Sequence, residues 1–162
     1  MKIVVFSDSH GMYNSMIDIV NSEEPNMVIH CGDFNRDADH LRRTFRTLEI
    51  HSVVGNCDYG DRSDTEDLFE VRGKRFYVTH GHLHGVKRDY TSLIYSAREK
   101  GADVAICGHT HVPLFEKHDG LYVINPGSIT FGGKTYGVIE ITENSFDYTC
   151  KTTGRVRGAG RR

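Results

Sequence analysis

KIVVFSDSHG, residues 2–11, joins an apolar run to an aspartate and a histidine that stand two residues apart, with a glycine directly behind them. The run KIVVF has the β-branched and aromatic composition of a buried strand. Asp8 and His10 therefore follow a predicted strand at its carboxyl end. The next question is whether other strands of the chain supply partners for this carboxylate and imidazole.

The same form, a β-rich run that ends in polar residues, recurs along the first two thirds of the chain. It is found in NMVIHCGD (26–33), EIHSVVGN (49–56), RFYVTHGH (75–82) and DVAICGHTH (103–111). Between these runs, segments 12–23, 36–48 and 88–101 have the apolar spacing of helices. This alternation is typical of an α/β protein. Beyond residue 112 we expect two strands within 113–127, joined at His118–Gly120, and a hairpin over 134–150 that turns at Glu143–Asn144.

Length and composition predict one domain. The chain has 162 residues, of which 38% are hydrophobic, which is enough to bury a core. We expect a single domain over 1–150 and a flexible basic tail over 151–162, which could also attract nucleic acid or an acidic partner.

The sequence shows neither a membrane span nor a signal peptide, so we expect a cytoplasmic protein without membrane contact. No CxxC pair is present, and reduced thiols are expected at Cys31, Cys57, Cys107 and Cys150.

The polar residues at the ends of the predicted strands fall into five groups. In chain order they are Asp8 and His10, Asp33, Asn56, His80 and His82, and His109 and His111. Residues i and i+2 of an extended segment project from one face, so three groups can direct two side chains at one point. Carboxyl ends of neighbouring strands also converge in α/β sheets. Imidazole, carboxylate and amide donors suit manganese, iron, nickel or zinc, and there are more donors here than one ion needs.

Each group taken alone also has a purely structural explanation. Asp8 can cap a helix that begins near Gly11, and Asp33 and Asn56 can be turn residues. A histidine is more often an ordinary core or surface residue than a ligand, and we expect this of His30, His40, His51 and His118. Likewise, Asn125–Ser128 (NPGS) is expected to be a turn alone, the alternative being a turn that returns the chain near the polar groups at the strand ends.

Taken together, the five groups resemble the motif set of the calcineurin-like metallophosphoesterase family. The motifs are DxH, GD, GN, HG and GHxH, found in family order at Asp8–His10, Gly32–Asp33, Gly55–Asn56, His80–Gly81 and Gly108–His111. The short chain and its GNCD and NPGS segments resemble the small bacterial and archaeal phosphodiesterase branch. This resemblance implies a four-layer α/β/β/α sandwich of two mixed β-sheets flanked by helices, with a dimetal site at the strand ends.

The resemblance also implies a role for each residue. Asp8, His10 and His111 would hold one divalent ion, Asn56, His80 and His109 a second, and Asp33 would bridge the two. Manganese is the expected metal, with nickel, iron and zinc as alternatives. The ions would activate water for hydrolysis of a phosphate ester. Asp33 and Asn56 are then catalytic as well. His82, in the family's HGH pattern, is expected to contact either the scissile phosphate or a residue that itself contacts the metal ligands.

One position departs from the wider family. Many larger members have a histidine directly after the asparagine, where this chain has Cys57, although the acidic Asp58 follows as in the family. Because that histidine is thought to protonate the leaving group or contact the phosphate, Cys57 favours a small-molecule phosphodiesterase over a general monoesterase. The alternatives are a metal-dependent nuclease and a non-catalytic scaffold of the same fold. The sequence does not indicate the substrate, the oligomeric state or a role for His84.

Overall fold

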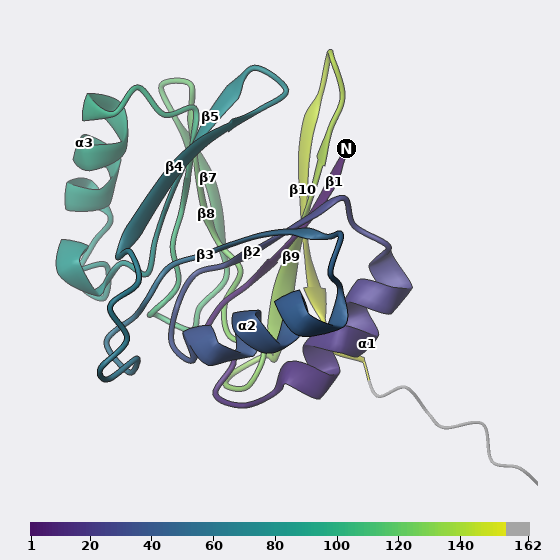
Figure 1. Cartoon of the computed structure of the whole chain (residues 1–162). Helices are drawn as coiled ribbons and strands as arrows, with labels where there is room; N and C mark the ends of the chain where they lie inside the picture. Colours follow the sequence, from purple (N-terminus) through teal and green to yellow (C-terminus); the bar gives the residue numbers. More distant parts are fainter. Residues whose placement is uncertain (155–162) are drawn as a thin grey trace, which may run out of the picture.

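The computed structural model describes residues 1–154, which form two five-stranded β-sheets packed face to face with helices on their outer faces (Figure 1). The expected four-layer α/β/β/α sandwich is confirmed. The predicted tail beyond residue 154 lies outside the described residues. No helix within residues 1–154 is long and apolar enough to cross a membrane.

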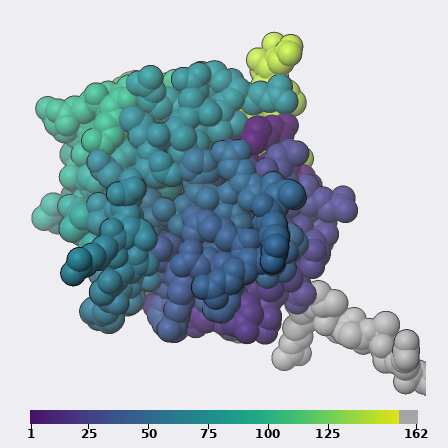
Figure 2. Space-filling model, viewed as in Figure 1, coloured from purple at the N-terminus to yellow at the C-terminus, as the bar shows by residue number. Residues whose placement is uncertain are grey.

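The first sheet has the strand order β10-β9-β1-β2-β3. Its strands are β1 (Lys2–Phe6), β2 (Met27–His30), β3 (Glu49–Ser52), β9 (Thr135–Ile141) and β10 (Phe146–Thr152). β1, β2 and β3 run parallel, whereas β9 is antiparallel to both β1 and β10. The hairpin that joins β9 to β10 projects beyond the body of the molecule (Figures 1 and 2).

The second sheet has the order β4-β5-β6-β8-β7. Its strands are β4 (Glu66–Val71), β5 (Lys74–Thr79), β6 (Val104–Ile106), β7 (Leu114–His118) and β8 (Leu121–Asn125). β5, β6 and β8 run parallel, and the edge strands β4 and β7 are antiparallel to their neighbours. Both sheets are therefore mixed, and in each of them parallel strands direct their carboxyl ends to one edge.

The two faces of β1 show why the layers form. Successive strand residues point to opposite faces, so Ile3 and Val5 lie in the core between the sheets, together with Phe76 of β5. Val4 and Phe6 face outward and pack beneath α1 (Tyr13–Glu23) and α2 (Asn35–Thr44). On the second sheet, α3 (Thr91–Glu99) covers the outer face with its buried Leu93 and Ala97.

Some elements differ from those predicted. α2 ends at Thr44 rather than at residue 48, because Phe45 leaves helical geometry at φ −114° and ψ 78°. β4, an edge strand that carries Glu66, Asp67 and Glu70, was not predicted. β10 continues to Thr152, past the predicted end of the hairpin at residue 150, because its last residues pair with Tyr136 and Thr135 of β9. The two predicted hairpins, β7–β8 and β9–β10, are confirmed.

Candidate metal centre

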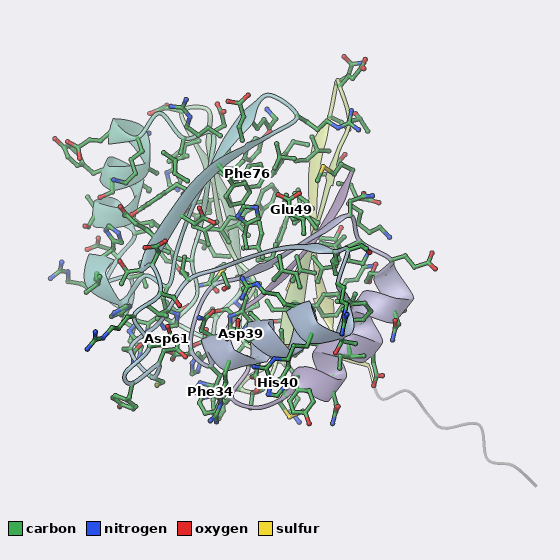
Figure 3. The ribbon with its side chains drawn as sticks, viewed as in Figure 1. Phe34, Asp39, His40, Glu49, Asp61 and Phe76 are labelled. Carbon is green, nitrogen blue, oxygen red and sulfur yellow. The ribbon has the colours of Figure 1, made fainter. Side chains whose placement is uncertain are left out.

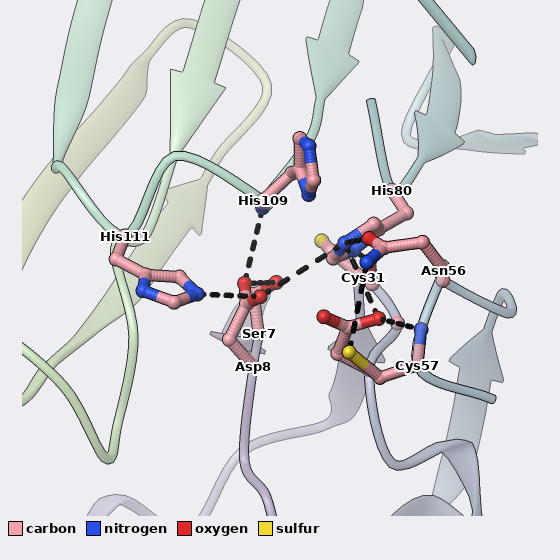
Figure 4. Close-up of polar contacts among 12 residues, drawn as sticks. Ser7, Asp8, Cys31, Asn56, Cys57, His80, His109 and His111 are labelled. Atoms are coloured by element: carbon pink, nitrogen blue, oxygen red, sulfur yellow. Dashed lines mark hydrogen bonds and ion pairs between the residues drawn. The ribbon is translucent and has the colours of Figure 1, made fainter. Parts of the chain in front are cut away.

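The predicted ligands converge at the edge where the parallel strands of both sheets end. Asp8 follows β1, Asp33 follows β2, His80 comes directly after β5, and the loop with His109 and His111 follows β6. Asn56 follows β3 after Val53 and Val54, which are buried. Figure 4 shows Asp8, Asn56, His80 and His111 directed toward a common centre from loops of both sheets.

The loops curl instead of continuing the strands. Five of the predicted ligands have left-handed backbone conformations, with φ values of 52° at Asp8, 44° at His10, 59° at Asp33, 68° at His109 and 60° at His111. Few residues other than glycine adopt this region, and such strained positions occur mainly at functional sites. The expectation that i and i+2 residues share one face of an extended segment is therefore wrong here. The pairs reach the centre because each loop turns sharply.

Asp8 is fully buried and lies at the middle of the cluster. Its Oδ1 lies 3.1 Å from Nε2 of His111 and 3.9 Å from Nε2 of His80. Its Oδ2 accepts hydrogen bonds from the Ser7 hydroxyl at 2.5 Å and from the backbone N–H of His109 at 3.1 Å. Asp8 is no helix cap, because α1 begins after Met12 and has no side-chain cap.

Asp33 lies between two histidines that come from different parts of the fold. Its Oδ1 is 3.4 Å from Nε2 of His80, and its Oδ2 is 3.9 Å from Nε2 of His10. The backbone N–H of Cys57 donates to Oδ1 at 2.9 Å. Burial opposes ionisation of Asp33, but His80 and the bonds from Cys57 outweigh this and lower the pKa of the carboxyl group. Asp33 is therefore an ionised carboxylate at neutral pH.

His80 is held in one orientation. It is fully buried, and its Nδ1 donates to the carbonyl oxygen of Cys31 at 2.7 Å, which leaves Nε2 facing the carboxylates. Burial disfavours the imidazolium, but Asp33 and Asp8 outweigh it and raise the pKa of His80. A position where two carboxylates favour a protonated imidazole is also one that a cation can occupy. A backbone carbonyl that fixes the far ring nitrogen is the usual arrangement behind a metal-binding histidine.

The ligand atoms form two overlapping groups that fit divalent cations. Among the described residues, the donor atoms of Asp8, His10 and His111 lie within 4.8 Å of one another, as do those of Asp8, Asp33 and His80. Nε2 of His80 also lies 3.1 Å from Oδ1 of Asn56, which is exposed. Carboxylate, imidazole and amide donors without thiolate suit borderline divalent metals.

The ring of His109 lies at the edge of the cluster, next to the two donor groups. Its ring centroid lies 5.0 Å from that of His80 and 6.1 Å from that of His82, and its ring is in neither donor group. Burial, together with nearby positive charge at His80 and Lys87, lowers the pKa of His109 to about 4. The ring is therefore neutral at pH 7, which is the form that binds a metal.

His82 does not lie on the strand face that the sequence suggested. β5 ends at Thr79, Gly81 has φ 103°, and His82 begins a short 3₁₀ turn, η1 (His82–His84). The ring still lies close to the cluster, with its centroid 5.4 Å from that of His80. Its Nδ1 is buried and has no hydrogen-bond partner among the described residues.

The other histidines have structural partners. His84 bonds to the hydroxyls of Tyr77 and Ser92 at 3.0 and 3.2 Å. The four histidines that we expected to be ordinary core or surface residues lie outside the donor groups. Their partners are Ser9 for His30, Tyr13 for His40, Asp67 for His51 and Glu116 for His118.

Sequence reasoning noted the residues that hold the ligand loops but did not assign their hydrogen bonds. Asp58 accepts three backbone N–H bonds, from Asp33, Asn35 and Gly55, at 2.7–3.0 Å. The acidic residue after GNC was the available signal. The NPGS segment is more than a turn, because the buried Ser128 donates to the carbonyl oxygen of Asp8 at 2.9 Å. The buried Asn125 donates to the carbonyl of Gly108 at 2.9 Å, next to His109.

Two motif glycines are required because a side chain would not fit at their positions. A Cβ on Gly55 would collide with Oδ1 of Asp33 and would lie 2.7 Å from its backbone nitrogen. A Cβ on Gly108 would collide with the Ser7 hydroxyl and would lie 2.8 Å from Oδ2 of Asp8. The GN and GH motifs therefore keep the backbone close to the two central carboxylates.

A buried carboxylate and imidazole cluster at the strand ends of two facing mixed sheets is the arrangement that the sequence led us to expect of a phosphoesterase. Comparison with known proteins agrees, because residues 1–144 match the model of the calcineurin-like phosphoesterase superfamily domain. The chain belongs to this family, and the predicted resemblance is confirmed.

Individual relatives carry related names. The chain is 39% identical over 132 residues to the probable metallophosphoesterase YsnB of Bacillus subtilis, which covers 80% of this chain and 75% of the relative. It is 30% identical over 170 residues to the phosphodiesterase MJ0936 of Methanocaldococcus jannaschii, with 90% and 96% covered. A crystal structure of a predicted phosphoesterase from Streptococcus pneumoniae superposes with a TM-score of 0.81 at 28% identity, with 94% of this chain and 89% of that chain covered.

Proposed function

We propose that this phosphoesterase is a dimetal-dependent phosphodiesterase. The observation that carries the proposal is the position of Asp33, whose two carboxylate oxygens face His80 and His10 at 3.4 and 3.9 Å. A carboxylate between two sets of donors is the arrangement that lets one residue hold two cations together. In this proposal Asp8, His10 and His111 bind one ion, Asn56, His80 and His109 bind the other, and Asp33 bridges them.

When bound, two divalent ions, with manganese expected, lower the pKa of water and offset the negative charge that develops on phosphoryl oxygens. The residues of the chain prepare the site for that chemistry. The bond from His80 to Cys31 directs Nε2 at the centre, and the bonds from Ser7 and His109 fix Oδ2 of Asp8. Asn56 contributes an uncharged amide at the exposed side of the cluster, where a substrate enters.

His82 is the proposed contact to the phosphate. Burial and the neighbouring His80 lower its pKa, so the ring is neutral at pH 7 and one ring nitrogen carries a hydrogen. A neutral imidazole can donate one hydrogen bond to a phosphoryl oxygen without competing for the cations. Its place beside His80 and His109 supports this role.

Cys57 supports a diester substrate. Burial, with the nearby carboxylates of Asp33 and Asp58, raises the pKa of its thiol to about 11, so the thiol stays protonated at neutral pH. Such a group is a poor general acid, because efficient donors have a pKa near the working pH. A site without a good proton donor is best suited to esters whose leaving groups need little help. One relative is also named a phosphodiesterase.

The test is a hydrolysis assay with metal-loaded and chelator-treated protein, using bis(4-nitrophenyl) phosphate and 4-nitrophenyl phosphate. We expect turnover of the diester with manganese, a lower kcat/KM for the monoester, and no turnover with chelator. The scaffold alternative predicts no turnover of either ester, and the nuclease alternative predicts turnover of DNA or RNA at a higher kcat/KM than the small diester. Cytoplasmic location stays an untested prediction.

A further inference from the structure

A cleft of about 470 Å³ opens directly beside the metal centre. It shares His10 and Cys57 with that centre, and its outer walls include Phe34, Arg36, Tyr59 and Asp61. In Figure 3, Phe34 and Asp61 lie near each other at the lower edge of the molecule, one at the start of α2 and the other in the segment after β3. That segment forms the lobe at the lower left of Figure 2.

One wall of the cleft is built from aromatic and guanidinium groups that contact one another. The guanidinium carbon of Arg36 lies 4.3 Å from the centroid of the Phe34 ring, and the Phe34 ring centroid lies 4.7 Å from that of His10. Arg36 is exposed and has no carboxylate within 4.0 Å among residues 1–154. The Phe34 and His10 rings are tilted by 54° to each other, so a stepped aromatic surface leads from a predicted metal ligand to an arginine that no acid of this part of the chain neutralises.

The other wall combines an aromatic ring with a fixed acceptor. Tyr59 is 90% exposed, so both faces of its ring are open to a ligand. Asp61 is held in place by two bonds, because Oδ2 accepts from the Asn35 amide at 2.8 Å and Oδ1 accepts from the Ser63 backbone at 2.9 Å. Each carboxylate oxygen has a second lone pair. Asp61 can therefore accept a further hydrogen bond from a hydroxyl or amino group in the cleft.

We propose that this cleft binds the nucleoside portion of a nucleotide phosphodiester. The base would stack on the plane of Arg36 or on Tyr59, as bases do on guanidinium and aromatic side chains. A hydroxyl of the sugar or an amino group of the base would donate to Asp61. The volume lies within the range of small-molecule sites. The proposal rests on the proposed function, since the phosphate must lie at the metal centre while the nucleoside fills the cleft.

Other occupants fit this cleft less well. An aliphatic alcohol of the glycerol type would leave the surfaces of Arg36 and Tyr59 unstacked. A second anionic group would meet one cation, Arg36, but also the carboxylates of Asp58 and Asp61. Only a planar group that carries hydrogen-bond donors uses the guanidinium plane of Arg36, the exposed ring of Tyr59 and the acceptor Asp61 together.

The kinetic test compares thymidine 5′-(4-nitrophenyl phosphate) with methyl 4-nitrophenyl phosphate, which release the same product. We expect manganese-loaded wild type to prefer the thymidine ester by about tenfold in kcat/KM, which is the effect expected from stacking one base. Tyr59→Ala and Arg36→Lys should each reduce this preference, because Lys keeps the charge of Arg36 but not its plane. The matched control is Tyr95→Ala on α3, whose ring is 66% exposed and outside the cleft.

The control should keep the wild-type preference. Equal kcat/KM for the two esters in wild type would overturn the proposal. Equal losses on both esters in the variants would also overturn it, because the cleft would then hold the nitrophenyl group that both share.

A binding test separates the cleft from the reaction. Free thymidine, which has no phosphate, is added to chelator-treated protein, and saturation-transfer NMR measures contact. We expect signal transfer to the base in wild type and Tyr95→Ala and its loss in Tyr59→Ala. No transfer in wild type would overturn the cleft proposal. Hydrolysis of neither ester, with thymidine still bound in the cleft, would instead contradict the proposed phosphodiesterase and leave the nucleoside site supported.

Discussion

His80 donates a hydrogen bond to the carbonyl oxygen of Cys31 at 2.7 Å, and this bond crosses from one sheet of the sandwich to the other. Cys31 follows β2 of the first sheet, whereas His80 follows β5 of the second. Both residues are fully buried. The orientation of the imidazole therefore depends on how the sheets pack, which links the core to the donor set of the candidate metal centre.

The first prediction is strict dependence on a divalent metal. Chelator-treated protein should lose hydrolysis of a phosphodiester, and manganese should restore it, whereas magnesium should restore it poorly because it prefers oxygen ligands and retains its waters. The measurement is turnover against metal content determined by elemental analysis. Full turnover by protein shown to contain no metal would contradict the proposed dimetal centre.

The second prediction concerns the bridging role of Asp33. Asp33→Asn keeps the shape of the side chain but removes its charge, so turnover should fall by about a hundredfold or more as the paired ions lose their shared ligand. The fold should persist, although Asp33 is 3% exposed and its loss of charge will cost some stability. Metal content and Tm are measured alongside turnover. The matched control is Asp39→Asn, whose carboxylate pairs with Arg42 on the surface of α2 and which should retain wild-type turnover.

Much of the fold could be predicted because its signals are local. Successive side chains of KIVVF point alternately into the core between the sheets and the core beneath the helices. The residue types at Asp119–Gly120 and Glu143–Asn144 indicate turns, and these turns join the strands of the two hairpins. β4 was missed because half of its sequence, EDLFEV, is acidic. The strand lies at the edge of its sheet, where fewer of its side chains need to be apolar than in a central strand.

The candidate site was predictable in its residues but not in its geometry. Asp8 and His10 were expected on an extended segment, yet both have positive φ, and no local pattern marks an aspartate or histidine for that conformation. His82 leaves the strand face because Gly81 turns the chain. The bond from Ser128 to Asp8 joins residues 120 positions apart, which no periodicity reveals.

The third prediction tests that long-range bond. Ser128→Ala removes the donor to the carbonyl of Asp8 and the acceptor for the N–H groups of Thr130 and Phe131. Metal affinity should fall by about tenfold, the usual effect of losing a group that orients a ligand. Titration calorimetry with manganese measures it, and Ser145→Ala in the exposed β9–β10 turn is the control. Unchanged affinity in Ser128→Ala would show that the NPGS segment is only a turn.

The fourth prediction is a pH dependence of stability caused by His30. Burial lowers the pKa of this fully buried ring to about 4, against 6.5 for the unfolded chain. Between these values the unfolded chain binds the proton and the folded chain does not, so stability falls as the pH falls from 6.5 to 4. The loss attributable to His30 approaches about 3 kcal/mol.

Urea unfolding of chelator-treated protein across that pH range measures the effect. His30→Gln cannot titrate, so its unfolding free energy should fall less steeply with decreasing pH than that of wild type, even if the variant is less stable at every pH. Parallel pH profiles for the two proteins would show that His30 does not contribute.

The last prediction concerns Cys57, which lies where larger family members are expected to have a histidine. Its backbone N–H donates to Asp33 at 2.9 Å, and its thiol, with a pKa raised to about 11, is a weak acid next to two carboxylates. Cys57→His would place an imidazole there, with a pKa nearer to the working pH. We expect this variant to shift the ratio of kcat/KM toward phosphomonoesters, most of all those with poor leaving groups. Cys57→Ser is the control for size and should keep the wild-type ratio. The alternative is that Cys57 only packs beneath the site as a small apolar residue. Both substitutions will then change Tm or metal content, while the ratio of kcat/KM stays the same in all three metal-saturated proteins. That result would show that the leaving-group argument is wrong.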